Sequence, residues 1–408
     1  MIILLLAGIL LIALSFIFRD KWPPFWGFLV VLLIMGFQEG VEGDFMNYKS
    51  AYEMIESDHI AEAAIIESES EPVMTYLMTA FSYVFPFWFF VFAMSFFQCY
   101  VLYKLVNRYT PKTYGFLAAI LFFFTFNMML LQMKAMRQGL AIELMVLAFL
   151  MADRKKTRWL SLLVVLMAYF SHNSMLVVLP FYLLFFIVTI RQQIKKDQLK
   201  RYGRLYSKSR KRARRIPAFR FFRVVRVWWR KYYLFPIIMV VIFLVMYFFK
   251  ITVLNQYLIP LMLLTGGSAN RLASYASTSN MSESLDANMF EISPLIVLYD
   301  AVIVFLVSDY LRTAGPKMRV FCIISITAAF GDMLFYGAGA FARMIMYYVV
   351  FNLIVYPSVA LRLKKKYGRL WALVFMVFLI GYAVKTSLPW ITGMTEDRFG
   401  TYRFVFMP

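Results

Sequence analysis

Long apolar runs recur along almost the whole chain, and they constrain its fold more than any other feature. Most of them are about 17–20 residues long, which is enough for a helix to cross the hydrocarbon core of a bilayer. Lipid offers no hydrogen-bond partner to the backbone, so a single span has to be helical. Hydrophobic residues make up 62% of the chain, against roughly 45–50% in soluble domains. The sequence therefore predicts an all-α, polytopic integral membrane protein.

About twelve spans follow from these runs, within one transmembrane domain that covers residues 1–408. The predicted spans cover about 2–18, 25–38, 86–103, 113–128, 133–152, 159–171, 174–190, 232–249, 292–311, 319–337, 343–361 and 370–387. The first run has the length of a signal peptide. It lacks a preceding basic region and a small-residue cleavage site, so we interpret it as the first span.

The distribution of charge predicts the orientation of these spans. The net charge is +21, and about 17 Lys and Arg lie in residues 191–231 against the single acid Asp197. Basic loops next to spans face the cytoplasm, which places 191–231 inside and both termini outside. Residues 38–85, an acidic loop, and 250–291 are then extracytoplasmic. We expect Pro72–Phe85 to form an interfacial or re-entrant helix, and the basic loop to meet anionic lipid headgroups rather than nucleic acid.

The first extracytoplasmic loop places three polar residues four positions apart. Asp44, Tyr48 and Tyr52 share one face if the segment is helical. One interpretation of this shared face is a candidate functional site. The alternative is a surface loop in which Asp44 caps a helix. Glu71 precedes Pro72, where an acid also complements a helix dipole.

The fifth predicted span opens with two cations and an amide. Lys134, Arg137 and Gln138 share one face of a helix at spacings of three and four. Snorkelling of the cations to lipid headgroups is one explanation. The other is a binding site, because an arginine buried in a membrane bundle is a functional hypothesis by default, and its guanidinium binds phosphate oxygens as a fork.

His172 is a candidate base, because it lies between two apolar runs and a histidine side chain titrates near neutral pH and can take a proton from a sugar hydroxyl. The alternative is that it only hydrogen-bonds a helix end. Further arginines fall on the same predicted face, and each has a tyrosine nearby. They are Arg271 with Tyr275, Arg343 with Tyr347, and Arg403 after Tyr402. Their negative partner is either a ligand or the intramembrane acids Asp300 and Asp332.

Taken together and in order, these residues resemble the EpsG-like proteins, which are Wzy-type polymerases of bacterial exopolysaccharide and capsule assembly. The resemblance rests on Gly43-Asp44, Tyr48, Tyr52, Glu71-Pro72, Arg137-Gln138, His172-Asn173-Ser174, Arg271 with Tyr275, and Tyr402-Arg403-Phe404. The long basic loop departs from that family pattern. The resemblance implies a helical bundle like that of GT-C glycosyltransferases or O-antigen polymerases, in the bacterial cytoplasmic membrane.

The resemblance also implies a reaction, in which an oligosaccharide on undecaprenyl diphosphate is transferred to another lipid-linked repeat unit. Arg137, Arg271 and Arg343 would hold the diphosphate leaving group, and His172 or Asp44 would activate the acceptor hydroxyl. The sugars would be contacted by Tyr48, Tyr52 and Tyr275. Flippase, chain-length and export proteins of the same pathway would be partners. No acidic cluster with metal-ligand spacing stands out, so the prediction is metal-independent chemistry without a cofactor.

Two other functions compete with this one. A transporter or flippase of lipid-linked glycans needs a polar path through the membrane, yet the deep spans hold only scattered acids such as Glu143. A membrane O-acyltransferase would also use a histidine, but its acyl donor would enter from the cytoplasm, whereas His172 is predicted outside. A scaffold that docks through the basic loop is the non-enzymatic alternative.

Overall fold

Helix α7 (Gly115–Phe124) lies at the centre of the first of two compact units in a computed structural model of the chain. Each of its residues is buried. A helix that is apolar on every side belongs either in the core of a protein or in a membrane, and here other helices surround it. It contacts α1 (Ile2–Ile17), α2 (Phe25–Gly36), α6 (Phe87–Tyr109), α21 (Asn352–Tyr367) and α22 (Arg369–Ile391).

The structure describes residues 2–17, 24–39, 44–57, 72–125, 128–129, 132–133, 135–202, 234–249, 294–334, 339–391 and 403–404. The first unit contains residues 1–190 and 349–408. Besides the helices around α7, it includes α3 (Asp44–Glu56), α5 (Pro72–Ser82), η1 (Lys112–Tyr114), α9 (Met136–Ala152), α10 (Leu160–Ser171) and η2 (Asn173–Val177).

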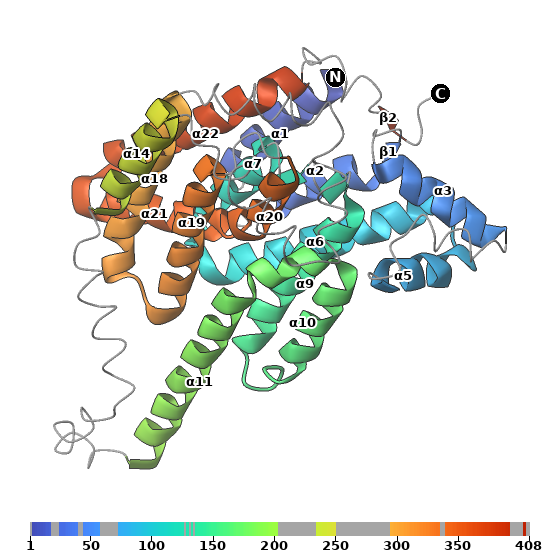
Figure 1. Ribbon diagram of the computed structural model, residues 1–408, viewed down its shortest axis with the longest axis horizontal. Helices are drawn as coiled ribbons and strands as arrows, with labels where there is room; N and C mark the ends of the chain where they lie inside the picture. Colours follow the sequence, from blue (N-terminus) through green and yellow to red (C-terminus); the bar gives the residue numbers. More distant parts are fainter. Residues whose placement is uncertain are drawn as a thin grey trace. The chain divides into compact units, whose positions relative to one another are not determined.

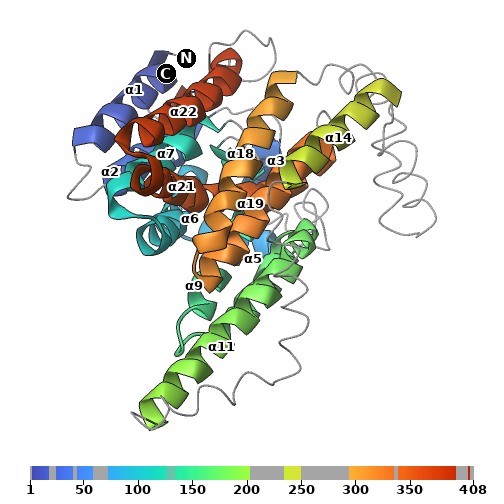
Figure 2. The same ribbon diagram turned by 90° about the vertical axis from the view of Figure 1, so that its left-hand side faces the viewer.

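The second unit contains residues 191–348. Its helices are α14 (Leu234–Phe249), α18 (Pro294–Thr313), α19 (Pro316–Leu334) and α20 (Gly339–Val349), which ends at the boundary. α18 packs between α14 and α19, as Figure 2 shows. The carboxylates of Asp300 and Asp332, on α18 and α19, are close enough to interact electrostatically. Helix α11 (Leu179–Tyr202) begins in the first unit and ends in the second.

One short sheet joins two segments that are distant in sequence. Strand β1 (Gln38–Glu39) pairs antiparallel with β2 (Arg403–Phe404), with Gln38 opposite Phe404 and Glu39 opposite Arg403 (Figure 1). Because β1 lies between α2 and α3, the pairing brings the end of the described chain to the start of the acidic loop. Strands β1 and β2 are the only strands in the described part of the chain.

The helices agree with most predicted spans, and the differences have local causes. The predicted eleventh span is two helices, because the chain turns at Val350 and Phe351. There Phe351 is buried against Phe149, with ring centroids 4.9 Å apart. The predicted seventh span begins as the short helix η2, and its helix α11 continues into the basic loop, where Gln193 donates to Asp197 at 2.8 Å.

Helix α5 is too short to cross a bilayer, since its 11 residues span only about 16 Å at 1.5 Å per residue. It packs beside α3 (Figure 1). The expected helix in residues 72–85 is thus present, and its length is that of an interfacial helix. Its position relative to a membrane stays a prediction.

Length and composition make α6 the one described helix that could by itself cross a membrane, and shorter apolar helices cover Phe25–Gly36, Lys112–Phe124 and Leu160–Ser171. Large apolar side chains face outward elsewhere. Leu163 on α10 is 59% exposed, and Leu370 and Val377 on α22 are 69% and 62% exposed. Exposed apolar faces of this size are typical of surfaces that contact lipid or another protein. The architecture is all-α and consistent with a helical membrane protein, while the count of twelve spans and the outward termini remain predictions.

Candidate functional site

Helix α3 confirms the shared face predicted for the first loop. It begins at Asp44, and Tyr48 and Tyr52 lie one and two turns later, with exposed fractions of 2% and 0%. The hydroxyl of Tyr52 donates to the carbonyl of Phe85 at 2.6 Å, and its ring packs on Phe87 and Phe90. This residue therefore fastens α3 to the corner between α5 and α6.

The pKa of Tyr52 is raised to about 12, first because the phenol is removed from water and second because Glu56 carries a negative charge nearby. The hydroxyl therefore stays protonated at neutral pH and can serve as the donor to Phe85. The predicted sugar contact of Tyr52 stays a prediction, and in this structure the side chain is engaged inside the protein.

Tyr48 contacts Arg137 at the beginning of α9. The Tyr48 hydroxyl lies 3.3 Å from Arg137 Nε and 3.5 Å from the Arg137 backbone nitrogen, and it accepts from both. The guanidinium carbon also lies 5.8 Å from the centre of the Tyr48 ring, which is within the range of a cation–π contact. Two motifs that are 89 residues apart in sequence thus form one cluster.

The start of α9 provides a positive electrostatic environment. Its N-cap is Ala135, which makes no side-chain capping bond. The first N–H groups of a helix point out of its N-terminus and carry the positive end of the helix dipole. With the half-buried Arg137 in the first turn, this end of α9 suits an anionic group such as a phosphate. Gln138, the next residue, is buried.

The chain before α9 folds back over the helix and is held by two buried amides. Gln132 Nε2 donates to a carboxylate oxygen of Glu143 on α9 at 2.8 Å. Gln38 Nε2, on β1, donates to the carbonyl of Met133 at 3.4 Å. Helix α9 begins at Met136, close to the predicted start of the fifth span near residue 133. Lys134 lies outside the described residues, so its predicted common face with Arg137 and Gln138 stays a prediction.

Strand β1 connects this turn to the other end of the chain. Glu39 pairs with the backbone of Arg403 in the ladder, and its carboxylate receives an ion pair from Lys49 on α3 at 3.4 Å. Gln38, Glu39 and Arg403 thus lie together with the Arg137 turn and with α3. The backbone of Arg403 thus lies near the early motifs, and its predicted role in the site stays a prediction.

His172 lies where α10 ends. Its backbone is extended, its N–H donates to the carbonyl of Ala168 at 3.0 Å, and its side chain is partly exposed. α9 and α10 form an antiparallel pair joined by a short turn, so the end of α10 lies beside the start of α9. η2, which follows His172, packs on α9. The histidine therefore lies at the same end of the hairpin as Arg137.

The remaining predicted site residues are described only in part. Glu71, Lys134, Arg271 and Tyr275 lie outside the described residues. Asp44, Arg343 and Arg403 are placed by their backbones, in α3, α20 and β2. Arg343 and Arg271 belong to the second unit, and their predicted roles beside Arg137 stay predictions.

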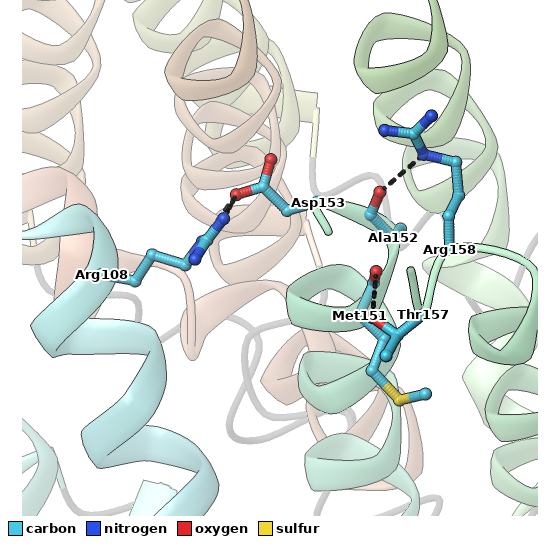
Figure 3. A network of polar contacts seen from close by, with 6 residues as sticks. All are labelled: Arg108, Met151, Ala152, Asp153, Thr157 and Arg158. Atoms are coloured by element: carbon cyan, nitrogen blue, oxygen red, sulfur yellow. Dashed lines mark hydrogen bonds and ion pairs between the residues drawn. The ribbon is translucent and has the colours of Figure 1, made fainter. Parts of the chain in front are cut away.

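A different polar network closes the opposite end of α9 (Figure 3). Arg108 on α6 forms an ion pair with Asp153, and its Nε–Oδ2 distance is 2.6 Å. In the turn that follows, Thr157 donates to the carbonyl of Met151 at 3.0 Å, and Arg158 Nε donates to that of Ala152 at 3.0 Å. These bonds satisfy carbonyls that a helix leaves open at its C-terminus.

Within the described residues, no three His, Cys, Asp or Glu side chains lie close enough together to hold a metal ion. The prediction of metal-independent chemistry is untested by this. The contacts that the sequence did not predict are Tyr48 with Arg137, and Gln132 with Glu143. The only sequence signal for the contact between Gln132 and Glu143 was that both polar residues lie in an otherwise apolar part of the sequence.

The fold defines a helical protein with exposed apolar helix faces and one cluster of Arg, Tyr and Gln side chains at a helix start. Residues 21–196 match the model of the EpsG family, and this segment contains α3, α9 and His172. The match confirms the resemblance over that part of the chain. It indicates a membrane protein of polysaccharide biosynthesis and, in general terms, a glycosyltransferase-type polymerase. No curated protein and no solved structure matches the chain.

Proposed function

We propose that this protein polymerises oligosaccharide repeat units carried on undecaprenyl diphosphate, at the extracytoplasmic face of the bacterial cytoplasmic membrane. The observation that carries the proposal is the placement of Arg137 in the first turn of α9, against Tyr48 and within the segment that matches the EpsG family. A guanidinium beside the N–H groups of a helix start is well suited to a diphosphate.

In the proposed reaction, a hydroxyl oxygen of the acceptor sugar bonds to the anomeric carbon of the donor glycan. The bond between that carbon and the diphosphate oxygen breaks, and the carrier leaves as the free diphosphate. Negative charge grows on the leaving oxygen, so Arg137 and the start of α9 stabilise the transition state more than the bound substrate.

The proton of the acceptor hydroxyl passes to a base. We assign this role to His172 or Asp44, because α9 and α10 bring His172 to the Arg137 end of their hairpin and Asp44 begins the helix that carries Tyr48. Tyr48 positions Arg137, Gln138 lies next to it, and Arg403 is supplied through β2. We assign Tyr52 to packing. Arg271, Tyr275, Arg343, Lys134 and Glu71 are proposed as further substrate contacts on the sequence pattern alone.

The test is a polymerisation assay with the purified full chain in detergent and a defined lipid diphosphate-linked repeat unit. We expect a ladder of glycan lengths. Arg137→Ala should lower the rate by roughly 10²–10³-fold, as is typical when a transition-state donor is removed. Arg137→Lys should be intermediate, since lysine keeps the charge and loses the fork. Arg154→Ala is the matched control, because Arg154 is exposed beyond the other end of α9.

Full activity of a well-folded Arg137→Ala protein would contradict the proposed diphosphate role. If a verified substrate gives only the unextended band, the polymerase proposal fails. Transfer of the same lipid across vesicle membranes would then indicate a flippase, and transfer of an acyl group to the glycan would indicate an O-acyltransferase. Loss of the ladder with His172→Ala but not with Asp44→Ala would assign the base to His172.

A further inference from the structure

We infer that Glu143 is a positioning residue for Arg137, acting through Gln132, and this inference rests on the proposed diphosphate role of Arg137. Glu143 lies further along α9 than Arg137 and is fully buried. Its carboxylate accepts a hydrogen bond of 2.8 Å from Gln132 Nε2. Gln132 precedes the helix, so this bond ties the chain before α9 to the helix itself.

Gly139 shows how closely the two segments approach. A Cβ atom at this position would lie 2.8 Å from Gln98 Nε2 on α6 and 3.1 Å from the Cα atom of Gln132. The backbone at Gln132 therefore rests on the surface of α9, and a side chain at position 139 would push it away. The hydrogen bond between Gln132 and Glu143, one turn after Gly139, holds Gln132 against α9.

A second hydrogen bond holds Met133, the residue that follows Gln132. Gln38 Nε2 donates to the carbonyl of Met133 at 3.4 Å. Four residues along the chain, Arg137 enters the helix with its side chain against Tyr48. Two hydrogen bonds thus hold the residues just before α9, one to Glu143 within the helix and one from Gln38 on β1. Moving the turn would move both Arg137 and the first N–H groups of the helix.

The use of a carboxylate at position 143 indicates that this hydrogen bond orients the segment before α9 rather than stabilising the fold. Within the described residues, the second Glu143 oxygen and the Gln132 oxygen are buried and have no hydrogen-bond partner. An apolar pair of the same size would avoid the loss of those bonds with water. A hydrogen bond is directional, however, so it fixes the orientation of Gln132 relative to α9 in a way that apolar packing does not.

The experiment compares four variants of the detergent-purified full chain, with inorganic pyrophosphate as the probe. Glu143→Gln keeps an acceptor for Gln132. Glu143→Met and Gln132→Met each remove one partner, and the double variant replaces both by an apolar pair. Readouts are pyrophosphate affinity by calorimetry, the melting temperature, and kcat and KM for the lipid-linked donor.

We expect Glu143→Gln to bind pyrophosphate as the wild type does. The double variant should recover a melting temperature close to that of the wild type, because no buried polar group is then left unmatched. It should still bind pyrophosphate roughly ten- to a hundredfold more weakly, as expected when a ligating group is displaced by about 1 Å. In an Arg137→Ala background, the same pair of substitutions should cause no further loss.

The inference is overturned if the double variant recovers pyrophosphate affinity together with its melting temperature, since the pair then serves stability alone. It is also overturned if wild-type protein binds pyrophosphate without needing Arg137. If wild-type protein binds pyrophosphate through Arg137 and the double variant does not, but no glycan ladder forms, the polymerase proposal fails and the positioning role stands. Each single variant is interpreted only with the double variant, so a poorly folding single variant does not decide the outcome.

Discussion

The two ends of helix α9 are both held by an arginine, but in different ways. At the C-terminal end, Arg108 meets the carboxylate of Asp153, whose side chain is 4% exposed, with an Nε–Oδ2 distance of 2.6 Å. At the N-terminal end, Arg137 meets a neutral phenol at 3.3 Å. A guanidinium on a carboxylate forms a strong, charge-assisted contact, and its contact with a neutral phenol is weaker. The first arrangement suits a structural role, and the second accompanies a helix start, which suits an anionic ligand.

The comparison also shows why arginine count alone says little about function. Both residues lie at the ends of apolar helices, where the sequence offers a choice between lipid headgroups, internal ion pairs and ligand binding. The acid within reach of Arg108 decides the first case. For Arg137, the helix start and the hydrogen bonds that hold the residues before it support a binding role. Matched substitutions at the two ends can therefore test whether the two arginines have different roles.

The largest expected effect comes from replacing each arginine by methionine, which keeps much of the volume and removes the charge. Arg137→Met should reduce polymerisation by roughly 10²–10³-fold with a nearly unchanged melting temperature. Arg108→Met should do the opposite, and destabilise the fold by about 1.5–3 kcal/mol because it removes a charge-assisted hydrogen bond to the Asp153 carboxylate. Activity per folded molecule and thermal melting separate the two. A pair of variants with the same profile would contradict the proposed division of roles.

A smaller effect is expected at Gly139. In Gly139→Ala, the new methyl group meets Gln98 and Gln132, so we expect about 1–2 kcal/mol of destabilisation by overpacking and reduced pyrophosphate affinity. Gly381→Ala is the matched control, since nothing lies within 4 Å of a Cβ atom there. In the middle of α22 alanine should stabilise by about 0.5–1 kcal/mol. Equal melting temperatures for the two variants would argue against the close approach at Gly139.

The two buried tyrosines of α3 provide a finer comparison. Tyr48→Phe removes the hydroxyl that contacts Arg137 and keeps the ring. Tyr52→Phe removes the hydroxyl that donates to Phe85. Each change should be worth about 1 kcal/mol. For Tyr48 it should appear as a few-fold weaker donor affinity, measured as KM, and for Tyr52 as a lower melting temperature. Reversal of that pattern would exchange their assigned roles.

The smallest effect is expected for the ion pair between Lys49 and Glu39, whose side chains are 33% and 42% exposed. Solvent and salt screen such a pair, so Lys49→Ala should cost at most about 0.5 kcal/mol. Thermal melts at low and high salt measure it, and the difference between variant and wild type should shrink as salt is added. A loss as large as that at Arg108 would mean that the β1 region is far less solvated than its exposure indicates.

The sequence predicted most helices because the apolar runs are long and separated by charged turns. It also predicted that Tyr48 and Tyr52 share a helix face, since a spacing of four determines this. It did not predict where α9 begins, because Leu131 to Met136 contains no proline or glycine that would mark a helix start. The start depends on Gln132 reaching Glu143, a contact between side chains 11 residues apart.

For the site, the sequence identified Arg137 but not what holds it. The partner, Tyr48, is 89 residues away, and no local pattern fixes a distance in space over such a separation. The split of the predicted eleventh span was missed for a similar reason. It follows from the burial of Phe351 against Phe149, a tertiary contact that hydropathy does not encode.

The pairing of β1 with β2 has a consequence for biosynthesis. Gln38 and Glu39 are translated long before their ladder partners Phe404 and Arg403. The Gln38 side chain can contact Met133 before the ladder forms, but Glu39 has to wait for Arg403. The ladder beside the start of α9 therefore forms only after Arg403 has been translated, and products of premature termination before that residue would lack it.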